Sequence, residues 1–549
     1  SGPNGGGEIL IGGSQQGAGP LPNALHLELG DRVTVSADAL LSGDGGKIIL
    51  YSEGTTVVHG AISARGENGG FIETSGATLE VLGAIDVSGV NGSGGEWLID
   101  PINVVVNAAL ATAISAQLNL GNNVTVTTNG GGPAVGNITV NASVTKSAGN
   151  PSRLRMEAHN NITFAGGVAI RSTGSSVNRL EIDLEADKDN NGAGTLVLNN
   201  VQLSSKGADI TLRGVGVTST GGTVNATGSG VVNGQILVNA KGGVVQLGGE
   251  LETLNPNANA LIIRNATTVV LNDIDALAGT FQLGIGGDIT GAVTQQPGSA
   301  ITALRFRVST AGSVTLQGAG NDVGTLAGLV GGSFSYRDAD NLTIGSVSGI
   351  DGLRTTGGLI SLATPARLTV NNPAAGFDVQ AASVVDLIAN NMTINGTIQG
   401  TRVTLRPFNP GNQVRLGGAD GAGILGLSSA ELNRVAADVL RIGNSTTGDI
   451  AIASAISPMG TSRLWLRTGG AVLDGNGAGN DITETSLTIE AATGIGSANP
   501  LETAVSNLAF RNSTSGNVKI ANAGPLVIAS LEGITTSSNA GGTTTITAA

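Results

Sequence analysis

The chain contains no cysteine and is poor in charged and aromatic residues, and each shortage excludes a class of protein. Without cysteine, its 549 residues form no disulfide bridges, Cys-ligated zinc sites or iron–sulfur clusters, and no thiol nucleophile is present. Charged residues are 12% of the chain and the net charge is −13, which excludes nucleic acid as a partner because that binding depends on Lys and Arg. No apolar run reaches the ~18 residues of a membrane-spanning helix. Aromatic residues at 2% leave the core to small aliphatic side chains.

Short aliphatic runs divided by turn residues fill most of the sequence. Runs such as LIIRN (261–265) and VTVTT (124–128) alternate with period two, as strands do. Glycine, at 88 positions, supplies the positive φ angles that tight corners need. Helical spacing is found from Asn107 to Leu118, and Ser428 and Glu431 have the spacing of a capping box. Both segments predict short helical flaps on a β structure.

The strands recur with a fixed internal offset. An apolar strand start is repeatedly followed by another eight residues later, as Leu261 is by Val269. The first members of these pairs recur at steps of roughly 19–28 residues, with one longer step, which is typical of a solenoid coil. The predicted starts are Leu261, Phe281, Phe306, Phe334, Ile360, Val384, Val403, Leu440, Leu464, Leu487 and Leu508. We therefore expect an all-β solenoid of roughly 20–24 coils with parallel strands. A tandem of β-sandwiches is the alternative, although sandwiches use longer strands and more aromatic anchors.

Charged residues follow the same register. The third residue after a predicted start is Arg in five coils, and parity places that position on the outer face. These residues are Arg264, Arg337, Arg406, Arg467 and Arg511. Glu490 occupies the same position in the coil between the last two, so opposite charges alternate there. The register predicts a surface ladder Arg467–Glu490–Arg511.

Residues 5–106 carry a series of motifs in a fixed order. They read GGGEILIGG (5–13), GDGGKIILYSEGTTVVHGAISARGENGGFIETSG (43–76) and GEWLIDPINVVV (95–106). This order resembles the repeat-proximal region of filamentous-haemagglutinin-like exoproteins of the two-partner secretion pathway. That family has a Gly-Gly-rich strand, an aromatic-Ser motif, an Ile-x-Ala-Arg-Gly turn, an apolar-Glu-x-Ser-Gly strand and a Leu/Ile-Asp-Pro closure. The matching positions here are Tyr51-Ser52, Ile62 to Gly66, Ile72 to Gly76 and Ile99-Asp100-Pro101.

The resemblance implies a right-handed parallel β-helix that is exported to the Gram-negative cell surface through an outer-membrane secretion partner. By the same resemblance the chain is a secreted adhesin or fibre that attaches to a host, cell or matrix surface. The chain departs from the family at Tyr51, where Trp is common. The amino-terminal secretion domain with its Asn-Pro-Asn motifs is not found, and Gly2-Pro3-Asn4-Gly5 echoes it only in part.

Candidate chemistry is concentrated in EIDLEADKDNNGAG (181–194), the most acidic stretch. Alternation places Glu181, Asp183 and Glu185 on one strand face, where unpaired, solvated carboxylates are the expected outcome and a catalytic cluster the alternative. Asp187, Asp189 and Asn191 match the first half of an EF-hand loop, but Leu198 stands where the bidentate Glu belongs. They form a weak Ca²⁺ candidate, with an acidic corner turn as the alternative.

We expect no enzyme activity and no cofactor. Glycine-rich stretches such as GGDITG lack the Lys-Ser/Thr of a phosphate loop, and the three histidines are scattered. The rival to a structural fibre is a polysaccharide-binding rod or carbohydrate-active enzyme. A sugar cleft would need convergent charged groups and aromatic platforms, and Trp97 and Trp465 are far apart in the coil order.

Three regions are predicted along the chain. Residues 1–106 form the family-like start, 107–260 form coils with the acidic loop 181–194, and 261–549 form the repeat region with an insertion near 420–436. The tract TTTITAA at the end has no polar cap. We therefore expect the chain either to continue in a longer rod or to stack end to end into filaments.

Overall fold

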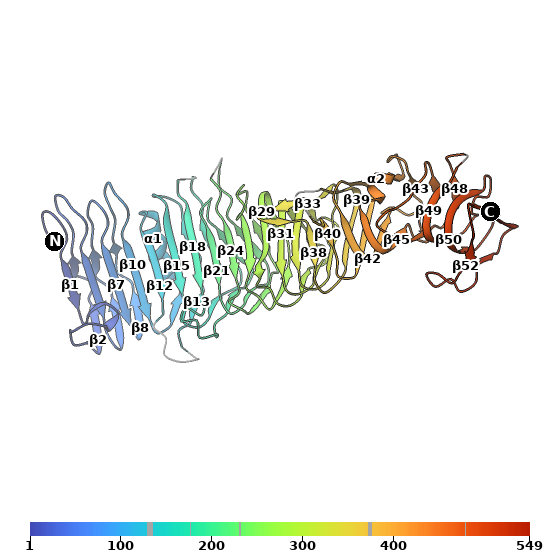
Figure 1. The fold of residues 1–549 in the computed structure, drawn as a ribbon. Helices are drawn as coiled ribbons and strands as arrows, with labels where there is room; N and C mark the ends of the chain where they lie inside the picture. The colour runs from blue at the N-terminus through green and yellow to red at the C-terminus, as the bar shows by residue number, and fades with distance from the viewer. Residues whose placement is uncertain (129–134, 176, 230–231, 372–375, 478) are drawn as a thin grey trace. The chain divides into compact units, whose positions relative to one another are not determined.

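The structure is a computed structural model that describes residues 1–128, 135–175, 177–229, 232–371, 376–477 and 479–549. It is nearly all β, with parallel strands stacked coil upon coil (Figure 1), so the predicted parallel β-helix is confirmed. The chain divides into two compact units. Unit 1 is Ser1–Gly284 with Asp288–Thr290, and unit 2 is Ile285–Gly287 with Gly291–Ala549. The sequence predicted a boundary between residues 260 and 261 from the spacing of the repeats. The two units are defined by compactness instead, so that boundary stays a prediction.

Unit 1 is built around one long ladder of parallel strands. Its members are β1 (Glu8–Ile11), β4 (Lys47–Tyr51), β7 (Phe71–Gly76), β10 (Glu96–Pro101), β12 (Asn123–Thr127), β15 (Ser152–Glu157), β18 (Leu180–Glu185), β21 (Ile210–Arg213), β24 (Ile236–Asn239), β27 (Leu261–Arg264) and β29 (Ile274–Gly287). Slim aliphatic residues stack inside it: Ile182 pairs with Leu154 on one side and Ile210 on the other, and all three are fully buried. The aliphatic side chains of each coil thus pack directly on those of the next coil. Small side chains fill this space, so the core needs few aromatic residues.

The other faces of unit 1 carry shorter strands. The second ladder is β11 (Val104–Val106), β13 (Ile138–Val140), β16 (Ile162–Phe164), β19 (Leu196–Leu198), β22 (Val217–Ser219), β25 (Val244–Gln246) and β28 (Thr268–Leu271). The third is β14 (Val144–Lys146), β17 (Ala169–Ser172), β20 (Val201–Ser204), β23 (Gly222–Asn225) and β26 (Glu250–Glu252). Near the amino-terminal end, two three-stranded sheets complete the coils: β2 (His26–Leu29), β5 (Thr55–Val58) and β8 (Thr78–Val81), and β3 (Thr34–Ser36), β6 (Ala61–Ser63) and β9 (Ile85–Asp86).

Paired glycines precede the first strands of the long ladder. The amide of Phe71 donates to the carbonyl of Gly46, and the amide of Glu96 donates to that of Gly70. A Cβ built on Gly70 would overlap the Gly46 carbonyl oxygen, and one on Gly95 would overlap that of Gly70. Only glycine therefore lets neighbouring coils approach closely enough to bond at these corners.

The first predicted flap is a helix, α1 (Ala108–Asn119), capped by the Asn107 side chain. The prediction of a peripheral flap is wrong, because Ile114 and Leu118 are fully buried and the helix packs against β9, β12 and β14. Lys146 is also fully buried and donates to the Leu118 and Ala148 carbonyls at the helix end. The i, i+4, i+8 apolar face thus replaces a strand as part of the coil wall.

Unit 2 also contains a long ladder of parallel strands. Its members are β30 (Val293–Gln295), β32 (Val314–Leu316), β34 (Phe334–Arg337), β39 (Ile360–Val370), β41 (Val384–Ile394), β42 (Ile398–Arg406), β45 (Val435–Ile442), β47 (Arg463–Arg467), β49 (Ile482–Ala491), β50 (Leu501–Asn512) and β52 (Val527–Ile528). Beside it lie β31 (Ile301–Thr310), β33 (Asp322–Val330), β35 (Leu342–Ile344), β38 (Leu353–Thr355) and β40 (Val379–Gln380). The described residues form about 20 coils, in agreement with the expected 20–24.

The remaining strands of unit 2 lie on its other faces. They are β36 (Ser346–Val347), β37 (Ile350–Asp351), β43 (Gln413–Leu416), β44 (Ile424–Leu427), β46 (Ile450–Ile452), β48 (Val472–Asp474), β51 (Val518–Asn522), β53 (Ser538–Asn539) and β54 (Thr544–Ala548). The insertion near 420–436 holds β44 and α2 (Ser429–Leu432), and the capping box of Ser428 and Glu431 is confirmed. Among the described residues, neither helix is long and apolar enough to cross a membrane.

The predicted register is correct in part of unit 2. Leu440, Leu464, Leu487 and Leu508 are successive partners, as expected. The predicted succession from Phe306 to Phe334 is wrong: Phe306 pairs with Leu326, and Phe334 pairs with Val314 and Ile360. Two faces of the coil carry the same apolar spacing, so the pattern alone does not tell one from the other. Ile360 also pairs with Val385 rather than Val384.

Candidate functional site

The acidic strand predicted at 181–185 is β18, and it lies between two strands that carry cations. Asp183 contacts Arg155 on β15 (Nε–Oδ2 3.3 Å) and Arg213 on β21 (Nη1–Oδ1 2.8 Å). Glu185 contacts Arg213 (3.4 Å) and Lys241 (2.8 Å). The shared face is confirmed, but the expectation of unpaired, solvated carboxylates is wrong for Asp183 and Glu185. Glu181 remains exposed.

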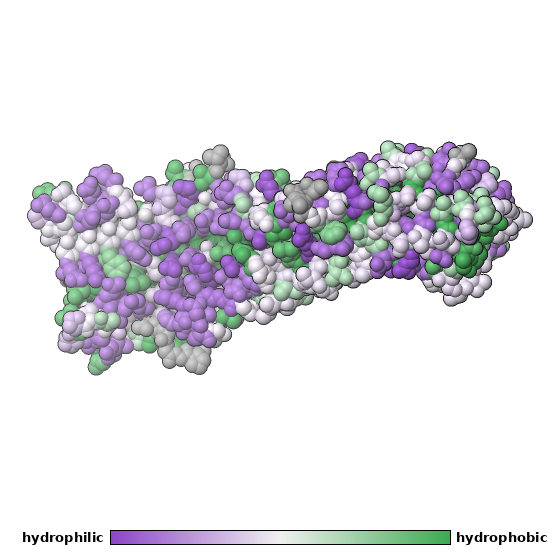
Figure 2. Space-filling view, in the orientation of Figure 1, coloured by the Kyte–Doolittle hydropathy of each residue, from purple (hydrophilic) through white to green (hydrophobic). Residues whose placement is uncertain are grey.

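Further ion pairs extend this arrangement along unit 1. Glu157 contacts Arg155 at 2.6 Å and Lys188 at 3.1 Å. We call Arg155, Glu157, Asp183, Glu185, Lys188, Arg213 and Lys241 the unit 1 ion-pair network. Burial raises the pKa of Asp183, and Arg213 and Arg155 oppose that rise. Figure 2 shows hydrophilic side chains gathered over the coils of unit 1.

The predicted Ca²⁺ loop follows β18 directly. Asp187 is buried, and its Oδ1 accepts from the amides of Gly192 and Ala193. The Asn191 amide donates to Asp189 Oδ2 at 2.9 Å. The three predicted ligands therefore belong to one hydrogen-bonded turn, and Ca²⁺ binding by Asp187, Asp189 and Asn191 stays a prediction.

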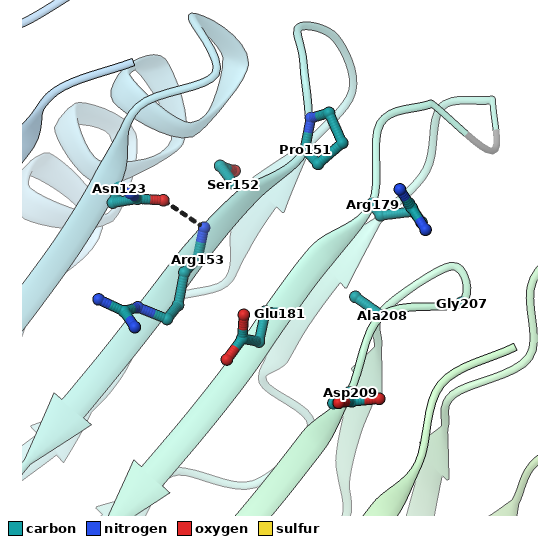
Figure 3. Close-up of a pocket in the computed structure, with 9 residues that line it drawn as sticks. All are labelled: Asn123, Pro151, Ser152, Arg153, Arg179, Glu181, Gly207, Ala208 and Asp209. Atoms are coloured by element: carbon teal, nitrogen blue, oxygen red, sulfur yellow. Dashed lines mark hydrogen bonds between the residues drawn. The ribbon is translucent and has the colours of Figure 1, made fainter. Parts of the chain in front are cut away.

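A shallow hollow of about 480 Å³ opens beside the exposed end of β18 (Figure 3). Four charged residues line it, from three neighbouring coils, and Asn123 Oδ1 accepts from the Arg153 amide at 2.9 Å. The full lining is Asn123, Pro151, Ser152, Arg153, Arg179, Glu181, Gly207, Ala208 and Asp209. The lining includes charged side chains of both signs, but no aromatic platform for a sugar.

Neither tryptophan offers an open platform. Trp97 is fully buried, and its Nε1 donates to Thr74 Oγ1 at 3.1 Å. Trp465 is 9% exposed, and the guanidinium groups of Arg441 and Arg467 lie over its ring, at 5.3 Å and 5.9 Å from the ring centre. Both indole rings therefore pack against neighbouring coils and are not open to a ligand.

The family-like motifs at the start of unit 1 are brought together in register. Tyr51 pairs with Ser75, and Ser75 pairs with Asp100, so the motif positions stack across three coils. Beside them Glu73 is fully buried and accepts from the Gln16 amide (2.8 Å) and Ser75 Oγ (2.6 Å). Burial raises the pKa of both Glu73 and Asp100. The contact between Gln16 and Glu73 was not predicted from the sequence. Gln16 lies in a 3₁₀ turn, η1 (Gln15–Gly17), which is far from Glu73 in the sequence.

The predicted charge ladder in unit 2 is confirmed. Arg467 pairs with Glu490 and Glu490 with Arg511 in successive strands, and each guanidinium nitrogen lies 3.8 Å from a Glu490 carboxylate oxygen. Trp465 Nε1 also donates to Glu490 at 3.1 Å.

Two groups of three carboxylates in unit 2 were missed. In the first, Asp338 is fully buried between Asp322 and Asp340, and its oxygens accept from the amides of Asp340 and Val323 and from the Tyr336 hydroxyl. Burial raises the pKa of Asp338 to about 6, and the charge of Asp340 adds to the rise while the hydrogen bonds oppose it.

The second group is Asp474, Asp481 and Glu502, with one oxygen of each within 4.8 Å of the others. Burial raises the pKa of Asp481 to about 7, and the charges of Asp474 and Glu502 add to the rise. The sequence signal was weak, because the three residues lie in separate short runs that meet only when the coils stack.

No protein-family model matches the chain, and no curated protein matches it.

Proposed function

We propose that this chain is a structural and adhesive fibre protein of the bacterial surface, similar to the rod part of filamentous-haemagglutinin-like exoproteins. The observation that carries the proposal is the motif order over residues 5–106, whose members stack in register across β4, β7 and β10. In this proposal the chain is secreted with the help of an outer-membrane partner. Its outer faces then meet a host, cell or matrix surface, and copies associate end to end.

The surface of the coils supports binding over an area rather than in a deep pocket. The unit 1 ion-pair network and the Arg467–Glu490–Arg511 ladder present alternating charges on successive strands. Such repeated polar faces are the extended binding surfaces that solenoids use.

The test is a glycan-array and cell-binding screen with the purified full chain, followed by electron microscopy over a range of concentrations. We expect saturable binding to a cell or matrix ligand, which weakens with salt. Absence of binding to cells, matrix proteins and glycans, together with single particles at every concentration, would contradict the proposal.

The second candidate is a polysaccharide-binding protein, and the hollow beside β18 favours it. Arg153 and Arg179 with Glu181 would suit a charged sugar. Binding of an acidic oligosaccharide that is lost in R153A/R179A, with unchanged circular dichroism, would favour this candidate. Product formation from the oligosaccharide would indicate an enzyme.

A further inference from the structure

The three carboxylates Asp474, Asp481 and Glu502 meet where three segments of neighbouring coils converge. Asp474 ends β48, Asp481 directly precedes β49, and Glu502 is the second residue of β50. Asp481 and Glu502 are joined by the backbone: the Asp481 amide donates to the Glu502 carbonyl at 2.8 Å, and the Glu502 amide donates to Asp481 Oδ2 at 2.9 Å. The parallel ladder between β49 and β50 thus fixes two of the three carboxylates relative to each other.

The spacing of the oxygens matches the coordination sphere of one calcium ion. Oxygen ligands lie roughly 2.3–2.6 Å from Ca²⁺, so two ligands of one ion are at most about 5 Å apart. One oxygen from each of the three carboxylates lies within 4.8 Å of the other two. For Mg²⁺, with ligands at about 2.0–2.1 Å, two ligands of one ion are at most about 4.2 Å apart, which is a narrower limit.

A second, independent observation is that two buried carboxylate oxygens in this cluster have no hydrogen-bond donor. Asp481 is 0% exposed, yet its Oδ1 has no partner. Glu502 Oε2 and Asn476 Oδ1 are likewise buried without a partner. Among the described residues, no Lys or Arg forms an ion pair with any of the three carboxylates. Buried acceptors without donors are rare in folded proteins, and an ion satisfies them.

Asp474 is already held in position for such a role. Its Oδ1 accepts from the amides of Asn476 (2.9 Å) and Gly477 (3.3 Å), and its Oδ2 accepts from the Asn499 side-chain amide. Asp474 and Glu502 are also partly exposed, which leaves a route from solvent. The turn therefore presents one oriented carboxylate beside two others that each have one oxygen without a donor.

The other acidic group of unit 2 shows what a saturated cluster looks like. Both oxygens of Asp338 accept hydrogen bonds from protein donors, including the Tyr336 hydroxyl at 2.9 Å. Asp322, Asp338 and Asp340 lie equally close together, but the buried member has no free oxygen. Both groups bring three carboxylates close together. They differ because only the group of Asp474, Asp481 and Glu502 has buried carboxylate oxygens without a hydrogen-bond donor.

We propose that Asp474, Asp481 and Glu502 bind a calcium ion, with Asn476 Oδ1 as a further ligand. The ion would join the turn after β48 to β49 and β50, so that it clamps neighbouring coils. Water and main-chain carbonyl groups would complete the six to eight oxygen ligands that Ca²⁺ takes. An extracellular site of this kind has a dissociation constant of roughly 10⁻⁴–10⁻³ M.

The experiment is equilibrium dialysis of the EDTA-treated full chain against radioactive calcium, with the thermal midpoint measured in parallel. We expect wild type to bind calcium and its thermal midpoint to rise with calcium concentration. Asp481→Asn with Glu502→Gln should lose one bound ion per chain and the calcium-dependent rise, while its circular dichroism in EDTA matches wild type. Asp322→Asn is the matched control from the saturated cluster and should bind as wild type does.

Two further measurements show which site binds the ion and whether the ion is Ca²⁺ or Mg²⁺. Asp189→Asn removes a carboxylate from the predicted loop in unit 1 and should leave this ion in place. Retention of full calcium binding by the Asp481→Asn, Glu502→Gln variant would overturn the proposal, as would tighter binding of Mg²⁺ than of Ca²⁺ by wild type.

Discussion

Carboxylates are partly buried in both units, and two sites, one in each unit, hold them differently. In unit 1, Asp183 and Glu185 meet Arg155, Arg213 and Lys241 from neighbouring coils. In unit 2, the carboxylate of Asp481 lies close to those of Asp474 and Glu502 and forms no ion pair with a described Lys or Arg. Both units have the same fold. The two sites differ in the side chain that the neighbouring coil places beside the carboxylate.

The comparison shows that the role of a buried carboxylate depends on the sign of the charge that a neighbouring coil places beside it. A cation one coil away neutralises the carboxylate and makes it part of the scaffold. A second carboxylate one coil away leaves a negative site whose stability depends on protons or ions. In a solenoid, the sign of the charge on the residue one coil away therefore determines whether a buried carboxylate forms a structural ion pair or part of a binding site.

The largest expected effect comes from removing a cation of unit 1. Arg213→Met leaves Asp183 and Glu185 short of a partner, and breaking such a pair costs about 3–4 kcal/mol where the charges are largely buried. The measurement is the urea midpoint of unit 1, followed by hydrogen exchange of β18 and β21. Arg213→Lys should recover most of the loss, and a midpoint equal to wild type for Arg213→Met would show that the network is not stabilising.

Asp338 sharpens the comparison, because it is buried and has donors but no cation. Its pKa of about 6 in the folded state lies above that of an unfolded carboxyl, near 3.8, so the folded state binds the proton more tightly. This contribution to stability is fully present below about pH 4 and is lost as pH rises through about 6, by up to about 3 kcal/mol. The unfolding free energy of wild type should therefore fall relative to that of Asp338→Asn from pH 4 to pH 6, because Asn does not titrate. A difference that is independent of pH would contradict the assignment.

Matched substitutions in the two units should have opposite signs. In EDTA, Asp183→Asn should destabilise the chain by about 1–2 kcal/mol, which is less than Arg213→Met because Arg155 keeps Glu157 and Arg213 keeps Glu185 as partners. Asp481→Asn should stabilise it by about 1 kcal/mol, because the Asn amide donates where two carboxylates repelled each other. Urea titration of both variants in the same buffer checks this, and equal signs would break the comparison.

The smallest effects are expected at exposed pairs. Glu490→Gln should cost about 0.5 kcal/mol, since both guanidinium groups of the ladder are partly solvated and the Trp465 hydrogen bond can persist. Lys47→Ala, which removes the outer pair with Glu8, should cost less still. Both losses should fall further in 0.5 M salt, because solvated charges are screened. A cost above about 1 kcal/mol for Lys47→Ala would contradict this ranking.

The sequence predicted the fold and one charged ladder because both depend on short spacings. The steps from Leu464 to Leu487 and Leu508 are regular, so Arg467, Glu490 and Arg511 fell into register. Phe306 and Phe334 were misplaced because two faces share one apolar pattern. The partners of Asp183 were missed for a further reason: Arg155 and Arg213 lie about one coil away on either side, and turns of variable length hide that relation in the sequence.

The paired glycines of β4, β7 and β10 restrict how this part of the chain can change its length in evolution. Each corner leaves room for hydrogen only, and the carbonyl of one coil occupies the place of a side chain in the next. A single inserted or deleted residue on the strand side would move a Cβ onto that carbonyl and separate the two coils. Whole coils can be duplicated or lost without this clash, because the glycines then meet again. Insertions and deletions in this segment should therefore be selected as multiples of one complete coil, while the outer turns vary freely.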